Sequence, residues 1–222
     1  MDFGLTPAAL RTGLLFYILL VACLGLRAYA QAWMADRLGD PTPRDEGRLS
    51  LNLVVHMDLI GSVILPLLSI FYLQPHIGSL KFFIAWTKPV PINPANFEHP
   101  QRDTLLTQFA PTMMGLLLAT ITAVAGGLTA HYSDKITEVA GSLIAINAML
   151  IVLDLIPLPP LPGGMLLRAF GLISEEMFWQ LARWGGLVLL VAINIPVIAG
   201  ILGLAIEVVQ TPFVLLFNRL VI

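Results

Sequence analysis

The sequence predicts an all-α polytopic membrane protein with about five to six transmembrane helices. Three observations support this class: 57% of the 222 residues are hydrophobic, only 12% are charged, and long stretches contain no Asp, Glu, Lys or Arg. The charged share is about half of that usual in soluble domains, which excludes a soluble globular protein. The net charge of −2 gives nucleic-acid binding no electrostatic basis. We expect a single integral membrane domain over residues 1–222.

The first predicted helix begins beside Thr6, which is suited to an N-cap, with Pro7 at the first helical position. Gly39 is a typical stop signal. A continuous helix from Arg11 to Asp36 is long enough, at ~1.5 Å per residue, to cross a hydrocarbon core of ~30 Å.

An alternative interpretation of this segment is a signal peptide. Arg11, the apolar run after it and Ala28-Tyr29-Ala30 imitate a signal sequence with an A-x-A cleavage site. We favour the transmembrane helix because Arg27 would lie just inside the cleavage region.

Further segments without charged residues predict the remaining spans. They are residues 59–73, with Pro66 in the middle, and residues 104–133, 139–153 and 184–206. Residues 208–218 predict a short or interfacial helix, so that C-terminal helices occupy residues 177–222. Pro196, Gly200 and Gly203 predict a break or kink in this last region.

Two segments between the spans, 40–58 and 86–102, are not helical in pattern. Residues 48–52 alternate apolar and polar side chains, which predicts a short strand, and the prolines of 86–102 predict extended backbone. We expect these β or extended segments near the membrane interface, where they pair with each other or hold the strand of a partner. The residues expected to bind a partner strand are Arg48, Leu49, Ser50, Leu51, Asn52, Lys88, Pro89, Val90, Pro91, Ile92 and Asn93.

Four motifs follow one another in a specific order and spacing. Residues 27–61 begin RAYAQAWMADRLGD, residues 86–94 are WTKPVPINP, residues 109–111 are FAP, and residues 154–163 are DLIPLPPLPG. This order resembles the short site-2 protease family of intramembrane zinc metalloproteases, whose later motifs are W-x-K-P-V-P-V-N-P, A-G-P and N-L-I-P-x-P-P-L-D-G. The resemblance covers roughly residues 12–190 and implies a site-2 protease-like core in a bacterial inner membrane.

The departures from the family pattern fall on its catalytic positions. The family's first helix carries HExxH, with two histidine ligands and a general-base glutamate, and here those positions are Arg27, Ala28 and Gln31. The third family ligand, the aspartate of L-D-G, is Pro162. Two further family asparagines correspond to Asp154 and Met114.

These replacements remove the chemistry that a zinc hydrolase needs. A catalytic zinc site has three protein ligands and one open position for water. An arginine is cationic and has no lone pair to offer, and Ala28 cannot accept a proton from bound water. We therefore expect no zinc, no other cofactor and no peptidase activity.

A rebuilt metal site from Cys23, His56 and Asp154 is the alternative that would keep an active intramembrane peptidase. It is disfavoured because Arg27 would stand among the ligands. Cys23 is instead interpreted as a small buried hydrophobe and His56 as a hydrogen-bond partner.

Two of the replacements introduce charge, Arg27 and Asp154. In the family fold these positions face each other, and an unpaired charge inside a membrane costs at least about 2.5 kcal/mol. We therefore predict a buried ion pair between Arg27 and Asp154, to which Gln31 adds a hydrogen bond. The alternative is that a polar cavity solvates each charge separately.

The function expected from the sequence is that of a catalytically inactive scaffold, assembly factor or accessory subunit of a larger membrane complex. Its partners would be the lipid bilayer and another membrane protein, or a transmembrane or extended peptide segment. A third possibility is a transporter or lipid-handling protein that reuses the polar cavity around Arg27.

Overall fold

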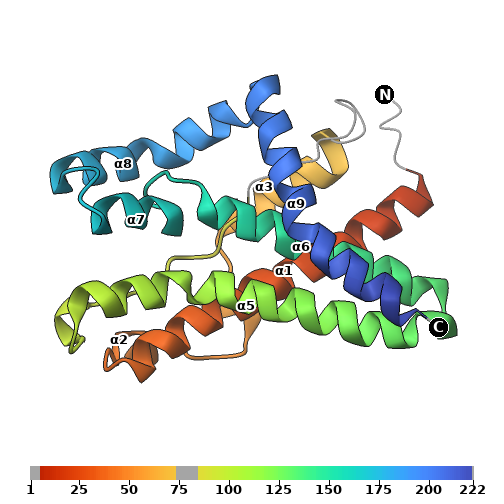
Figure 1. The fold of residues 1–222 in the computed structure, drawn as a ribbon, viewed down its shortest axis with the longest axis horizontal. Helices are drawn as coiled ribbons and strands as arrows, with labels where there is room; N and C mark the ends of the chain where they lie inside the picture. Colours follow the sequence, from red (N-terminus) through yellow and green to blue (C-terminus); the bar gives the residue numbers. More distant parts are fainter. Residues whose placement is uncertain (1–5, 74–84, 222) are drawn as a thin grey trace.

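The computed structural model describes residues 6–73 and 85–221, and this part of the chain is predominantly helical (Figure 1). The long helices are α1 (Pro7–Arg37), α5 (Pro100–Thr129), α6 (Asp134–Leu155), α8 (Glu175–Ala192) and α9 (Pro196–Leu220). The short α-helices are α2 (Thr42–Asp45), α3 (Leu65–Leu68) and α7 (Pro162–Ala169). Single 3-10 or π turns cover Leu53–His56, Leu59–Ile64, Ser69–Leu73, Pro94–Asn96 and Ala130–Tyr132.

Four helices in the described residues are long and apolar enough to cross a membrane: Pro7–Arg37, Pro100–Tyr132, Asp134–Leu155 and Pro196–Leu220. The sequence predicted about five to six. The apolar helix Leu59–Phe71 is shorter than a full span, and α8 begins with Glu175 and Glu176. These features are those of an all-α membrane protein.

Helix α1 follows the signals of its sequence. The Thr6 side chain accepts a hydrogen bond from the Ala9 N–H at 3.2 Å, and Pro7 is the first helical residue. The helix continues without interruption to Arg37. Gly39 then takes a φ of 105°, a left-handed conformation that a glycine adopts without strain. Continuity through residues 28–30 agrees with a transmembrane helix.

Helix α5 lies at the centre of the packing, against α1, α6 and α9 (Figure 1). Small residues allow close contact with α9: a Cβ on Gly127 would lie 2.7 Å from the Phe217 carbonyl oxygen. A second cluster joins α1 to α6 and α8 through Leu20, Leu24, Ile146, Leu150 and Leu189. Leu24, Leu150 and Leu189 of this cluster also line the cavity described below.

The last region departs from the prediction of one span over residues 184–206 and a separate tail. Instead the helix breaks at residues 193–195, and α9 continues through Gly200 and Gly203 to Leu220. Pro196 has no N–H with which to continue the hydrogen bonds of the preceding helix. At the end of that helix, the Asn194 side chain donates to the Leu190 carbonyl oxygen at 2.7 Å. The proline therefore starts a helix, while the two glycines leave it intact.

The strand predicted at residues 48–52 is not formed, and the described residues contain only one isolated antiparallel bridge, between Met57 and Thr87. Side chains take the place of strand partners. The His56 Nε2 lies 2.8 Å from the Ser50 carbonyl oxygen, and the Asn52 side chain accepts from the Val54 N–H at 3.1 Å. Polar side chains thus fix this segment as a folded loop.

Candidate functional site

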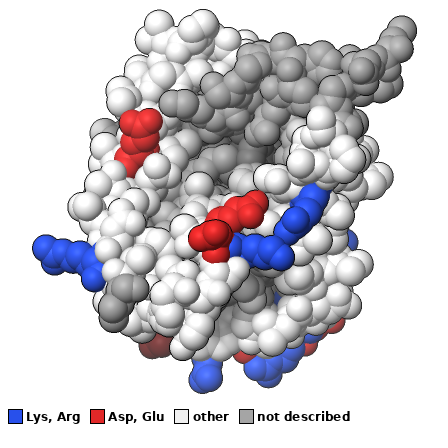
Figure 2. All heavy atoms as spheres, turned by 90° about the vertical axis from the view of Figure 1, so that its right-hand side faces the viewer, with Lys and Arg blue, Asp and Glu red and all other residues white. Residues whose placement is uncertain are grey.

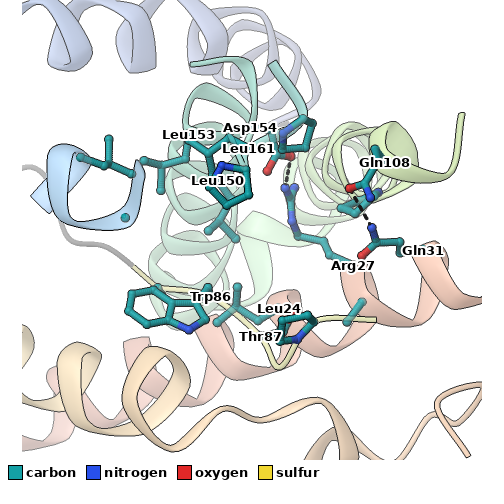
Figure 3. Close-up of a pocket in the computed structure, with 18 of the residues that line it drawn as sticks. Leu24, Arg27, Gln31, Trp86, Thr87, Gln108, Leu150, Leu153, Asp154 and Leu161 are labelled. Carbon is teal, nitrogen blue, oxygen red and sulfur yellow. Dashed lines mark hydrogen bonds and ion pairs between the residues drawn. The ribbon is translucent and has the colours of Figure 1, made fainter. Parts of the chain in front are cut away.

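A cavity of about 440 Å³ opens between α1, α5, the end of α6, residues 85–89 and α8. Figure 3 shows it with Trp86 and Leu24 on one side and Asp154 and Leu161 on the other. Its lining is mostly apolar. Arg27, Gln31 and Gln108 lie on the side formed by α1 and α5, and Asp154 of α6 faces Arg27 (Figure 3). Five of the six positions that depart from the family motifs line this cavity, namely Arg27, Ala28, Gln31, Asp154 and Pro162.

Arg27 and Asp154 form an ion pair across the cavity. Arg27 comes from the middle of α1 and Asp154 from the last turn of α6, and their side chains are 5% and 15% exposed. Thr112 of α5 donates its hydroxyl to Asp154 Oδ2 at 2.6 Å. The pair therefore connects α1 to α6, and the threonine adds α5 to the same carboxylate.

Gly115 of α5 provides the space for the guanidinium. A Cβ on this residue would lie 2.2 Å from Arg27 Nη1. This buried nitrogen has no hydrogen-bond partner within the described structure, whereas Nη2 contacts Asp154. The guanidinium is thus held on one side by charge and on the other by close packing.

Gln31 does not join the ion pair, which corrects the expectation for this residue. Its Nε2 donates to Gln108 Oε1 of α5 at 3.1 Å (Figure 3). Gln108 and Thr112 were missed by the sequence analysis. They precede Gly115 by seven and three residues, so the three residues share one face of α5. Polar and small residues at this spacing, in a span without charges, were the sequence signal for a polar face directed at the site. Met114, matched to a family asparagine, does not line the cavity.

The residues at this site do not fit a catalytic zinc ion. Arg27 and Gln31 stand where two imidazoles would be needed, and proline 162 has no side-chain donor. Among the described residues, no group of three His, Cys, Asp or Glu side chains could hold a metal. Neither Cys23 nor His56 lines the cavity. Cys23 instead contacts the Asn147 amide at 3.4 Å, and His56 contacts the Ser50 carbonyl oxygen.

The extended segment 86–93 is attached to the loop 56–62 by one of its edges. The Trp86 N–H donates to the Gly61 carbonyl oxygen at 3.2 Å, and the Lys88 N–H to that of His56 at 2.8 Å. Backbone groups alternate in direction along an extended chain, so the positions left for the other edge are Thr87, Pro89 and Pro91, and of these Pro89 already gives its carbonyl oxygen to Arg48. Prolines have no N–H, and Thr87 alone supplies a backbone donor among these three.

Arg48 holds this segment to the end of the preceding loop. Its buried guanidinium donates to the carbonyl oxygens of Val55, Lys88 and Pro89, in the last two cases at 2.6 and 3.1 Å. Leu49, Val90 and Ile92 pack with Ala28 and Ala32 of α1. Of the residues expected to bind a partner strand, Arg48 and Val90 are therefore buried, whereas Leu51 is 65% exposed.

Asp40 fastens the far end of the same segment to the end of α1. This fully buried carboxylate accepts from the Asn93 N–H at 2.7 Å, from Asn96 Nδ2 at 2.8 Å and from the Thr42 hydroxyl at 2.6 Å. Burial raises the pKa of Asp40, but the hydrogen bonds from Thr42, Asn96 and Asn93 outweigh it and hold the pKa below its ordinary value. Burial also lowers the pKa of His56, which favours its neutral form.

The chain has a relative in Bacillus subtilis (strain 168) that bears the name "Putative zinc metalloprotease YwhC". The two are 27% identical over 154 residues, which are 66% of this chain and 64% of the relative. The match thus covers slightly less than two thirds of the relative's length. This name is consistent with the resemblance to site-2 proteases. No protein-family model matches the chain, and no solved structure matches it significantly.

Proposed function

We propose that this chain is a non-hydrolytic relative of the intramembrane zinc metalloproteases, which binds a segment of another membrane protein as a scaffold or accessory subunit in a bacterial inner membrane. The observation that carries the proposal is the Arg27–Asp154 ion pair inside the cavity. A guanidinium at this point repels a divalent cation and occupies the carboxylate. Ala28, on the same wall, offers no general base.

The cavity is the feature that supports binding. It is mostly apolar, it has two amide side chains in Gln31 and Gln108, and Thr87 adds one backbone edge. We propose that an apolar segment of a partner enters between residues 85–89 and α8. Because Pro89 and Pro91 have no N–H, side-chain packing contributes more to this binding than a continuous ladder of main-chain hydrogen bonds.

Metal content tests the loss of hydrolysis. We expect the purified chain to contain no stoichiometric zinc after zinc is added at neutral pH, as measured by elemental analysis, and to leave an apolar membrane peptide uncut. The variant Arg27→His/Ala28→Glu/Gln31→His/Pro162→Asp gives the assay a positive reference if it takes up zinc. Stoichiometric zinc in the unmodified chain, or zinc-dependent cleavage by it, would overturn the proposal.

Site-specific crosslinking in native membranes tests partner binding. A photoreactive amino acid at Pro89, an exposed position that lines the cavity, should give one discrete adduct. The same probe at Leu187, which is exposed on α8 but does not line the cavity, is the matched control. A bulky Gly186→Trp change in the cavity wall should abolish the Pro89 adduct. Equal adducts from both probe positions, insensitive to Gly186→Trp, would contradict binding in the cavity.

A further inference from the structure

A second concave surface lies apart from the cavity, between the N-terminal halves of α1 and α6. This groove has a volume of about 470 Å³. Helix α1 contributes Arg11, Leu14 and Ile18 to its lining. Nothing in the proposed function uses this groove, and none of its residues belongs to the motifs described above.

The residues of the groove are ordered along its length. On α1, Arg11, Leu14 and Ile18 are three and seven residues apart and therefore share one face of the helix. On α6, Lys135 precedes Val139 by one turn. Both helices begin at the same end of the molecule and run in the same direction (Figure 1). Each helix thus presents its cation first and its apolar side chains deeper in the membrane.

The charges of the groove have a net positive sum. Arg11 and Lys135 supply two positive charges and Glu138 one negative charge, which gives +1. Within the described residues, neither Arg11 nor Lys135 has an ion-pair partner. Figure 2 views the molecule from this end, where acidic and basic side chains gather near the middle of a mostly uncharged face.

Beyond the two cations, the groove is lined by the apolar side chains Leu14, Ile18 and Val139. Leu14 and Ile18 are 52% and 56% exposed, although they line a concave surface. Both lie on a helix that is long and apolar enough to cross a membrane. An occupant that satisfies the whole groove therefore carries one negative charge at the membrane surface and a hydrocarbon chain directed inward.

We propose that the groove binds an anionic phospholipid of the surrounding bilayer, with its phosphate between Arg11 and Lys135 and an acyl chain along Leu14, Ile18 and Val139. The headgroup charge of −1 complements the groove's +1. Two cations from different helices can contact one phosphate together, and this contact joins the starts of α1 and α6. A free phosphate would match the cations but leave the apolar wall without a partner.

Native mass spectrometry of the delipidated full chain in detergent tests this site. Phosphatidylglycerol should bind more tightly than phosphatidylcholine with the same acyl chains. Arg11→Gln and Lys135→Gln should each weaken phosphatidylglycerol binding about fivefold, and Glu138→Gln should strengthen it. All three side chains are exposed, so the variants should fold, which their thermal unfolding checks. Arg219→Gln, which removes an exposed cation from the last turn of α9, is the matched control and should change little.

Three results would overturn the proposal. Equal affinity for the two lipids would show that the cations do not recognise the headgroup charge. An equal loss from Arg219→Gln would show a general effect of surface charge. Competition by glycerophosphoglycerol, the same headgroup without acyl chains, at the concentration at which the lipid saturates would show that the apolar wall does not contribute.

Discussion

Arg27 is held by one carboxylate, and that carboxylate is in turn held by a threonine. The three side chains come from three helices, with α1 supplying the arginine, α6 Asp154 and α5 Thr112. Removing one partner leaves the other charge buried without compensation, whereas removing both leaves a mainly apolar interface. The stability of the fold should therefore depend on the pair in a strongly non-additive way.

Arg27→Met and Asp154→Leu should each destabilise the protein by on the order of 3–5 kcal/mol, and the double variant should regain most of this loss. Unfolding in detergent, followed by circular dichroism, measures the three differences. Arg44→Met is the control, because Arg44 is 63% exposed in its pair with Asp36 and its loss should cost at most about 1 kcal/mol. Single variants no less stable than this control would argue against a structural ion pair.

Asp40 predicts a dependence of stability on pH. Its pKa is lower in the folded chain than its ordinary value, because hydrogen bonds from Thr42, Asn96 and Asn93 outweigh the effect of burial. The carboxylate therefore contributes stability above an ordinary pKa of about 3.9, and this contribution is lost as pH falls through the folded pKa. Asp40→Asn should be less stable than the unmodified chain at pH 7, by about 1–3 kcal/mol.

The measurement is the unfolding free energy of both chains between pH 3 and 8. The difference between them should shrink below about pH 4. Asp45→Asn, a change at an exposed position five residues later, should follow the unmodified chain throughout. A constant difference between the Asp40→Asn variant and the unmodified chain over the whole range would show that the charge of Asp40 is not what stabilises the segment.

Single residues also show where sequence reasoning succeeded and where it stopped. Arg27 and Asp154 are the charges that interrupt apolar stretches, so their meeting follows from the cost of leaving either one alone. Gln31 was assigned to the wrong partner, because the competing acceptor, Gln108, is a neutral residue on another helix. The charge pattern carries no information about such an amide pair, which depends on the rotation of α5 against α1.

At the scale of elements, the packing of α8 depends on a glycine. A Cβ on Gly185 would lie 1.9 Å from the Pro159 carbonyl oxygen, whereas a Cβ on the adjacent Gly186 would meet no atom within 4 Å. Gly185 therefore allows α8 to approach the turn before α7, and this approach closes one wall of the cavity.

Gly185→Ala should shift α8 and lower the thermal midpoint of unfolding, because backbone must move to admit the methyl group. Gly186→Ala should leave the midpoint unchanged or raise it slightly, by up to about 1 kcal/mol in stability, because alanine favours a helix over glycine. Differential scanning fluorimetry in detergent compares the two neighbours directly. Equal effects would place α8 differently from the arrangement in Figure 1.

The elements differ in how far their sequence determines them. Helix α1 has a cap, a proline at its start and a glycine after its end, and its bounds could be predicted. The loop 48–52 alternates like a strand, yet Asn52 and His56 satisfy its backbone locally. The backbone of a short polar segment can be hydrogen-bonded either by nearby side chains or by a neighbouring strand. Alternation of apolar and polar residues does not distinguish a loop of the first kind from a strand.

At the scale of the whole molecule, hydropathy was sufficient to predict an all-α membrane protein but not the number of crossings. Residues 104–133 and 139–153 lie within α5 and α6 and the turn between them, as their lack of charge indicates. The region after residue 184 required knowledge of where one helix ends, because Pro196 can either kink a helix or begin one. Packing of the helices decides between these outcomes.

Helix α9 illustrates a further consequence. Only 6% of its most apolar window is buried inside the molecule, while Phe217 near its end packs tightly against α5. Its inner face is half-buried, because Leu202 and Ile206 pack on the cluster that joins α1, α6 and α8, whereas Leu204 and Val208 on its outer face are 63% and 72% exposed. Exchanges among the apolar residues of the outer face should therefore be tolerated more readily than changes at Leu202, Ile206 or Phe217.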